Sequence, residues 1–321
     1  MTADDGDDRA MTLPQPRVAY LGPPGSFAHE AALTLDGYGT LEPYPSVPHA
    51  LDAVRIGDAT WALVPFENSV EGGVAGTLDE LGDLGRAPLQ IAREVLLDVH
   101  FVLVARAGTA LSDVRVVATH PHAEAQCRAW LAASLPDAEV VLTASTSTAA
   151  RDVAAGTYDA AVTGLAAAEV YGLTRLVDDI ADNDAAVTRF VLVGLPHRPA
   201  PPTGQDRTTV VLYEDEDHSG ALLEMLTEFA VRGVNLTRLE SRPTGEGLGK
   251  YCFSLDCDGH IFDARVGETL AALHRICGDV RFLGSYIREG AKPVEPRRGT
   301  SDADFAEAKQ WLEAVRRGEI G

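Results

Sequence analysis

The feature that most constrains the fold of this chain is a regular alternation of short apolar runs and amphipathic segments between Arg17 and about Leu195. The apolar runs have the length of strands, and the segments between them repeat their hydrophobic residues at helical spacing. Such alternation predicts an α/β architecture with largely parallel sheets. The expected strands are Val18–Leu21, Ala62–Phe66, Val99–Val104, Val114–Ala118, Glu139–Leu142, Ala160–Thr163 and Phe190–Val193, and the expected helices are Phe27–Leu35, Val47–Ile56, Thr77–Leu84, His122–Leu135, Thr148–Ala155 and Leu165–Tyr171.

A second pattern follows a Pro-rich stretch that ends at Thr203-Gly204. It runs strand, helix, strand, strand, helix, strand, which is the ferredoxin-like βαββαβ order. The final segment, roughly Asp302–Arg317, has the spacing of an amphipathic helix. The expected units are a disordered tail (1–16), a first domain (17–195), a linker (196–206), a second domain (207–288), and a linker with a terminal helix (289–321).

The formal net charge is -21 over 321 residues. A strongly acidic chain is a poor partner for nucleic acid and for an anionic membrane surface. No apolar run reaches membrane-spanning length, and residues 1–10 are acidic where a signal peptide would be basic. We therefore expect a cytoplasmic protein with no nucleic-acid or membrane partner. A small anion would need a locally positive pocket made by Arg side chains or helix N-termini.

Four polar segments follow strand ends in the first domain: Gly22–Phe27, Pro65–Ser69, Thr119–Gln126 and Thr188–Phe190. Ligands of open α/β sheets bind beyond the carboxyl ends of strands, so we expect these segments to converge on one cleft. Plain strand-to-helix turns and helix caps would explain the first two equally well. A metal site at the two histidines of the third is not favoured, because no Cys or acidic residue recurs at ligand spacing.

Thr188-Arg189-Phe190 places a hydroxyl donor beside a permanent cation. Such a pair suits a small anionic substrate that must lose a hydroxyl. In a regular strand, however, Thr188 and Phe190 share one face and Arg189 points away. Both functional groups can serve one ligand only if the strand bends or lies between two lobes.

Together with Gly220–Leu222 and Glu240–Pro243 in the second domain, these segments resemble the prephenate dehydratases, in the same order and from about residue 17 to about 288. The second domain resembles an ACT domain, a small regulatory module that binds amino acids. The resemblance implies a two-lobed catalytic domain similar to the periplasmic binding proteins, with the active site between the lobes. Lobe 1 is expected at about 17–97 and 187–195, and lobe 2 at about 98–186.

The activity that the resemblance implies is that of a carbon–oxygen lyase without a metal or organic cofactor. It removes water and carbon dioxide from prephenate, giving phenylpyruvate in phenylalanine biosynthesis. Thr188 is expected to donate a proton to the leaving hydroxyl, Arg189 to neutralise a carboxylate, and Glu67 to orient its neighbours. The expected catalytic residues are Thr188, Arg189, Glu67, Asn68 and Gln126, and the expected substrate-binding residues are Ser26, Phe27, Ser69, Thr119, Thr163 and Phe190.

The resemblance also implies that phenylalanine binds between two ACT domains and lowers the activity. The alternative is that the residues concerned only shape a turn and a dimer edge. The expected oligomer stays open between a homodimer and a homotetramer. The expected regulatory residues are Gly220, Ala221, Leu222, Glu240, Ser241, Arg242 and Pro243.

Two other functions remain compatible with the sequence. An arogenate dehydratase would use the aminated relative of prephenate, and nothing in the sequence separates the two substrates. A non-catalytic amino-acid sensor with a solute-receptor fold is the other alternative. The Thr188-Arg189-Phe190 motif and the Glu67-Asn68 pair favour an enzyme over a sensor.

Overall fold

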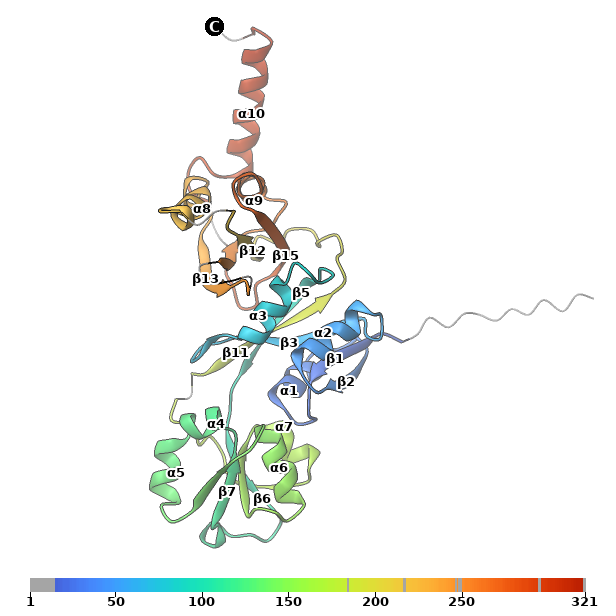
Figure 1. Cartoon of the computed structure of the whole chain (residues 1–321), viewed down its shortest axis with the longest axis vertical. Coiled ribbons are helices and arrows are strands. Elements are labelled where there is room, and N and C mark those ends of the chain that lie inside the picture. The colour runs from blue at the N-terminus through green and yellow to red at the C-terminus, as the bar shows by residue number, and fades with distance from the viewer. Residues whose placement is uncertain are drawn as a thin grey trace, which may run out of the picture.

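The computed structural model describes residues 15–319, apart from 184, 216–217, 246, 248–249 and 294–295. Within these ranges the chain forms three sheets, each the centre of one structural part. Figure 1 shows these parts stacked along the long axis, with lobe 2 at the bottom, lobe 1 in the middle and the C-terminal domain above it. The predicted disorder of residues 1–16 falls almost wholly outside the described residues.

Lobe 1 is built on a sheet with the strand order β2-β1-β3-β11-β5, and a short β4 pairs with β3. The prediction of largely parallel sheets is wrong, because β11 runs antiparallel to both of its neighbours. The chain returns from lobe 2 through β11, so this strand points away from lobe 2 while β3 and β5 point toward it. The elements are β1 (Arg17–Leu21), α1 (Phe27–Leu33), β2 (Thr40–Tyr44), α2 (Val47–Arg55), β3 (Trp61–Asn68), β4 (Gly72–Gly73), α3 (Ala75–Gly82), β5 (Gln90–Asp98) and β11 (Val187–Gly194).

Lobe 2 has the strand order β10-β6-β9-β7-β8. The predicted strand Val99–Val104 is wrong at its start, because the chain crosses between the lobes there and β6 begins at Val102. The predicted helix His122–Leu135 is interrupted at Cys127. The elements are β6 (Val102–Ala105), η1 (Leu111–Asp113), β7 (Val116–Thr119), α4 (Pro121–Gln126), α5 (Arg128–Ser134), β8 (Glu139–Leu142), α6 (Thr146–Ala154), β9 (Ala160–Thr163), α7 (Leu165–Val170) and β10 (Thr174–Val177).

The chain passes between the lobes twice, from β5 to β6 and from β10 to β11. Two α/β lobes joined by paired crossings are the arrangement of solute-binding proteins, so the predicted two-lobed fold class is confirmed.

The C-terminal domain is an antiparallel sheet with the strand order β13-β14-β12-β15. This order confirms the predicted ferredoxin-like βαββαβ fold. A final helix, α10, projects away from the domain in Figure 1. The elements are β12 (Asp206–Tyr213), α8 (Ala221–Val231), β13 (Leu236–Pro243), β14 (Tyr251–Asp258), α9 (Ala264–Ile276), β15 (Asp279–Ile287) and α10 (Asp302–Arg316).

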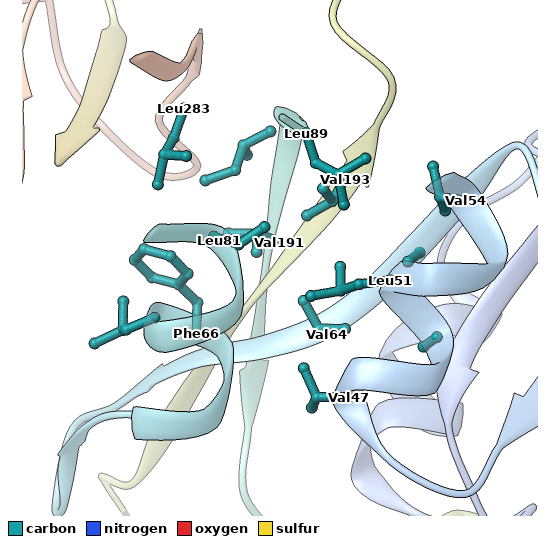
Figure 2. Packing of buried hydrophobic residues seen from close by; sticks show 14 of the residues in the cluster. Val47, Leu51, Val54, Val64, Phe66, Leu81, Leu89, Val191, Val193 and Leu283 are labelled. Atoms are coloured by element: carbon teal, nitrogen blue, oxygen red, sulfur yellow. The ribbon is translucent and has the colours of Figure 1, made fainter. Parts of the chain in front are cut away.

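One hydrophobic cluster joins lobe 1 to the C-terminal domain. Val191 and Val193 of β11 pack in it with Leu283 and Tyr286 of β15, and Figure 2 shows Leu283 facing Leu81 and Leu89. The residues between them, such as Leu192, pack on the other face of the sheet with Tyr20 of β1. Strand β11 is therefore buried on both faces, which explains its continuous apolar run.

Candidate active site

A cavity of about 310 Å³ lies between the two lobes. It is bordered by the carboxyl ends of β1 and β3, the start of β11, and the first turns of α1, α4 and α6. The lining residues from lobe 1 are Leu21, Gly22, Ser26, Phe27, Ala28, Pro65, Asn68, Glu71, Thr188 and Phe190, and those from the crossing and lobe 2 are Val99, Phe101, His120, His122, Ala123, Gln126, Ala144, Ser145 and Thr146.

Thr188 and Asn68 face each other across β11 and β3. The side-chain Nδ2 of Asn68 donates to Thr188 Oγ1 at 2.9 Å. The orientation of this amide is determined by its oxygen, which accepts the backbone N–H groups of Val70 at 2.8 Å and Glu71 at 3.2 Å. Since Thr188 Oγ1 receives a hydrogen bond from Asn68, its own proton is available for donation into the cavity.

Arg189 does not line the cavity. Its side chain leaves the opposite face of β11, is 4% exposed, and contacts the carboxylates of Glu67, Glu94 and Asp256. Glu67 lies with it on that face. The geometry therefore gives no support to the predicted contact between Arg189 and a substrate carboxylate, because strand alternation turns the side chain toward the C-terminal domain.

Ser26, Phe27, Gln126 and Phe190 border the cavity as predicted from their segments. The hydroxyl of Ser26 is already engaged, because it donates to the carbonyl of Leu21 at 2.8 Å and accepts the backbone N–H of His29 at 3.2 Å. Ser26 is thus the N-cap of α1.

Three predicted substrate-binding residues, Ser69, Thr119 and Thr163, do not line the cavity. The hydroxyl of Thr119 is fully buried and donates to the carbonyl of Val162 at 2.9 Å. Ser69 Oγ accepts the backbone N–H of Val187 at 2.9 Å, which ties β11 to the loop after β3. Thr163 is fully buried, and within the described residues its hydroxyl has no hydrogen-bond partner. These side chains shape the site without bordering the cavity.

Sequence reasoning missed the residues that α6 contributes. Ser145 is the N-cap of this nine-residue helix, with Oγ accepting the backbone N–H of Thr148 at 3.0 Å. Ser145 and Thr146 both border the cavity. The first turn of a helix leaves backbone N–H groups without intrahelical partners and is suited to an anion. The Ser-Thr-Ser-Thr run that begins at Ser145 is a recognisable N-cap pattern that could have revealed this turn.

Among the described residues that line the cavity, none is Lys or Arg. The basic side chains there are His120 and His122, and His122 Nδ1 lies 2.5 Å from Glu71 Oε2 of the opposite lobe. Burial lowers the pKa of His120, and the neighbouring His122 lowers it further while Glu71 opposes both. His120 is consequently neutral at pH 7. A negative ligand in this cavity must be held mainly by neutral donors and helix N-termini.

The lobes also meet directly at Pro24. Its carbonyl accepts hydrogen bonds from Tyr171 at 3.0 Å and from Ser147 Oγ at 2.5 Å. The adjacent Gly25 has a φ of +82°, and a Cβ there would lie 2.8 Å from Cα of Ala167. Only glycine permits this approach of the turn before α1 to α7, which brings the two lobes into direct contact.

The predicted regulatory residues occupy two places in the C-terminal domain. Ala221, at the start of α8, borders a cavity of about 150 Å³. Gly220 before it has a φ of +99°. The segment Glu240–Pro243 ends the edge strand β13, where Arg242 Nη2 pairs with Asp79 of lobe 1 at 2.8 Å.

Two wider observations bear on the class of protein. In the described ranges, no group of three or more His, Cys, Asp or Glu side chains could hold a metal ion. None of the described helices combines the length and apolarity needed to span a bilayer.

Comparison with known proteins gives matches to a family profile, to protein sequences and to solved structures. The sequence profile of the family described as prephenate dehydratase matches residues 18–198. The chain is 48% identical to a prephenate dehydratase of Mycolicibacterium vanbaalenii, covering 94% of this chain and 99% of that one. It is 49% identical to a prephenate dehydratase of Mycolicibacterium smegmatis, with 95% and 99% covered. The crystal structure of an Arthrobacter aurescens prephenate dehydratase in complex with L-Phe superposes with a TM-score of 0.89 at 47% identity, covering 94% of this chain and 99% of that one.

Proposed function

Because the chain belongs to the prephenate dehydratase family, we propose that it converts prephenate to phenylpyruvate, water and carbon dioxide in the cavity between its lobes. The observation that carries this proposal is the hydrogen bond from Asn68 Nδ2 to Thr188 Oγ1 at 2.9 Å. It leaves the Thr188 proton free to meet the leaving hydroxyl of the substrate.

The reaction needs one proton and no redox partner. Thr188 donates its proton as the ring C–O bond breaks, which releases water. The bond to the ring carboxylate breaks with it, and its electron pair enters the ring, which becomes aromatic. The Asn68 amide stabilises the negative charge that develops on Thr188 Oγ1. Solvent then returns the proton to Thr188.

Binding of a dianion in a cavity without Lys or Arg depends on neutral donors. The first turn of α6 and the Gln126 amide offer these on the lobe 2 side. Phe27, Phe101 and Phe190 give the ring an apolar wall. Lobe closure excludes water and strengthens each of these hydrogen bonds.

The test is direct incubation with prephenate, followed by the absorbance of phenylpyruvate. Turnover is expected with prephenate, and a parallel incubation with arogenate, followed by phenylalanine formation, measures the preference between the two substrates. Tight binding of prephenate without product would instead indicate a sensor protein and overturn the proposal.

Phenylalanine is the proposed effector, and it lowers turnover by binding to the C-terminal domain, an ACT domain in this proposal. The support is the L-Phe complex of the Arthrobacter relative and the match of Gly220–Leu222 and Glu240–Pro243 to the motifs of the family. A titration of the activity with phenylalanine tests this, and unchanged turnover at saturating phenylalanine would overturn it.

The proposed assembly is a homodimer or homotetramer in the cytoplasm, with no cofactor. Helix α10 supports self-association, because Trp311 is 57% exposed, Leu312 41% and Val315 39%, all on one stripe. Exposed apolar stripes of this kind mark protein contacts. Light scattering on the full chain gives the mass, and a Trp311→Glu variant is expected to lower it if α10 forms the contact.

A further inference from the structure

Thr188 and Asn68 lie on the cavity face of β11 and β3. Six buried or half-buried charged side chains lie on the opposite face, which packs against the C-terminal domain. We call them the interdomain charge cluster. They are three carboxylates and three guanidiniums, namely Glu67, Glu94, Asp256, Arg189, Arg207 and Arg238.

Arg189 is the centre of this cluster. Its Nη2 lies 3.0 Å from Glu67 Oε2 and 2.6 Å from Asp256 Oδ2, and its Nη1 lies 3.4 Å from Glu94 Oε2. One guanidinium thus joins two carboxylates of lobe 1 to one carboxylate of the C-terminal domain. The planar fork of Arg suits this arrangement, because Lys presents a single point charge.

The remaining contacts complete the connection between the domains. Arg207 Nη1 lies 2.6 Å from Glu94 Oε2, which is a second ion pair across the interface. Arg238 Nε lies 3.1 Å from Asp256 Oδ2. The guanidiniums of Arg189 and Arg238 each lie 4.7 Å from the centre of the Phe66 ring. The cluster is therefore continuous from β11 to β13.

Lobe 1 depends on the C-terminal domain to balance its buried charges. Lobe 1 supplies Glu67, Glu94 and Arg189, and the C-terminal domain supplies Asp256, Arg207 and Arg238. Lobe 1 alone thus has one carboxylate in excess, whereas the charges of the C-terminal domain balance once Glu240, which lies 3.6 Å from Arg238, is counted. Buried charges without partners are strongly unfavourable. The relative position of the two domains is consequently coupled to the position of each side chain in the cluster.

Two residues of the cluster, Arg189 and Glu67, are the sequence neighbours of Thr188 and Asn68. In the register of β11 and β3, Arg189 faces Glu67 and the neighbouring Thr188 faces Asn68. The register shifts immediately after Arg189, so this point of the sheet is irregular. A displacement of Arg189 toward or away from Asp256 is transmitted through one peptide unit to Thr188. Misplacement of a reacting group by about 1 Å can cost about 100-fold in rate.

Within the described residues, the hydrogen bonding of the interdomain charge cluster is incomplete. Within the described part of the chain, the buried Nε atoms of Arg189 and Arg207 have no hydrogen-bond acceptor. A buried donor without an acceptor destabilises the state that contains it. Burial of these two donors thus lowers the stability of the present arrangement of the cluster.

We propose that Arg189 and Glu67 are positioning residues, through which the C-terminal domain sets the placement of Thr188 and Asn68 toward the substrate. The proposal rests on the proposed function. It adds that the effector changes turnover through the interdomain charge cluster, and that neither Arg189 nor Glu67 contacts prephenate.

The test replaces Asp256 by Asn in the full-length protein. This variant keeps the side-chain shape, removes the charge that Arg189 reaches across the interface, and changes nothing that lines the cavity. We expect kcat to fall about tenfold or more with KM changed by less than about twofold, which is the pattern of a lost transition-state interaction. We also expect phenylalanine to lose its effect on turnover, a coupling that is typically about 5- to 150-fold.

Asp258→Asn is the matched control. Asp258 lies two residues further along β14 and is also buried. Its partners are Arg288 at 3.0 Å and Asn235 at 2.8 Å, both in the C-terminal half of the chain and outside the cluster. We expect this variant to keep the wild-type kcat and the wild-type response to phenylalanine, even where its melting temperature falls.

Arg207→Gln is the second variant, since it breaks the cross-domain pair with Glu94 and leaves the contacts between Arg189 and Asp256 in place, and circular dichroism verifies its fold. A loss of phenylalanine response in Arg207→Gln supports the proposal even if Asp256→Asn does not fold. If either folded variant keeps the wild-type kcat and the wild-type inhibition by phenylalanine, and only its melting temperature falls, the cluster stabilises the interface without affecting turnover. That outcome would overturn the proposal. A rise in KM at constant kcat in Arg189→Lys would indicate substrate contact and also overturn it. Failure of the proposed function is distinguishable, because the wild type itself would then show no turnover.

Discussion

The two faces of β3 and β11 differ in the kind of polar group that they present. The cavity face carries the neutral Thr188 hydroxyl and the Asn68 amide, joined by one hydrogen bond. The opposite face carries the charged side chains of Arg189 and Glu67, which pair with each other, and Arg189 also pairs with Asp256 of the C-terminal domain. A hydroxyl can release a proton to a leaving group, whereas a guanidinium is always charged and is suited to holding carboxylates in fixed places. Adjacent residues of one motif thus meet different neighbours, because Thr188 borders the cavity and Arg189 reaches the C-terminal domain.

The largest expected effect comes from removing the proton donor on the cavity face. Thr188→Ala should lower kcat by about 100- to 10,000-fold, the usual contribution of a general acid. The fold should be unchanged, as measured by circular dichroism. Thr188→Ser is the matched control and should stay within about tenfold of wild type, because it keeps the hydroxyl and its partner. A folded Thr188→Ala protein with normal turnover would remove Thr188 from the mechanism.

The next largest effect is expected from a variant that tests the direction of the hydrogen bond between Asn68 and Thr188. Asn68→Asp keeps the shape but replaces a donor with an acceptor, so the Thr188 proton turns toward Asp and away from the substrate. The new carboxylate also repels a dianion. We expect kcat/KM to fall about 100- to 1,000-fold, as for loss of an oxyanion donor. Asn68→Ala, which adds no charge, should be less impaired, and equal activity of wild type and Asn68→Asp would contradict this role.

On the opposite face, acidification should weaken the contact between the domains. Burial by itself raises the pKa of Asp256, but Arg238, Arg189 and Arg207 outweigh it and hold the pKa well below its usual range. The stabilisation is therefore complete above the unfolded pKa of about 4 and is lost as the pH falls below it. Asp256→Asn should cost about 3–5 kcal/mol at pH 7. The melting temperatures of wild type and variant should converge as the pH falls from about 4 to about 2. A difference in melting temperature that stays constant over this range would contradict the prediction.

The smallest effect concerns the contact between the lobes. Tyr171→Phe removes one of the two side-chain hydrogen bonds to the carbonyl of Pro24, worth about 0.5–1.5 kcal/mol. A less stable closed state should raise KM about two- to tenfold with little change in kcat. Ser147→Ala should act in the same way. If neither variant changes KM in steady-state assays, this contact does not contribute to closure.

Much of the fold followed from hydrophobic alternation, and the missed strands have identifiable causes. Strand β2 is an edge strand that contains Glu42 and Pro43, so it has no apolar run. Strand β5 was missed because Arg93 and Glu94 interrupt its apolar residues. The charge of Glu94 is tolerated there because Arg207 pairs with it. Pattern reading within one segment cannot detect a partner that another domain supplies.

The residues of the candidate site likewise divide into those that local sequence indicates and those that depend on packing. Strand-end motifs indicated Ser26, Asn68, Gln126 and Thr188, which all border the cavity. Strand alternation indicated that Arg189 would point away from Thr188, but its distant partner Asp256 depends on how the domains pack. Whether a threonine borders a cavity or lies in its wall, as Thr119 does, likewise depends on tertiary structure. Local sequence predicts which groups gather at an edge, and packing decides which of them a ligand can reach.

The surplus carboxylate on the lobe 1 side of the interdomain charge cluster limits how these parts can be exchanged between genes. A two-lobed half severed from the C-terminal domain would retain this surplus carboxylate, and a C-terminal domain grafted onto an unrelated two-lobed receptor would leave Arg207 without its partner Glu94. Productive shuffling must therefore transfer the matching positions of β5 and β11 together with the module. A chimeric biosensor that combines such parts would therefore need all residues of the interdomain charge cluster transferred together.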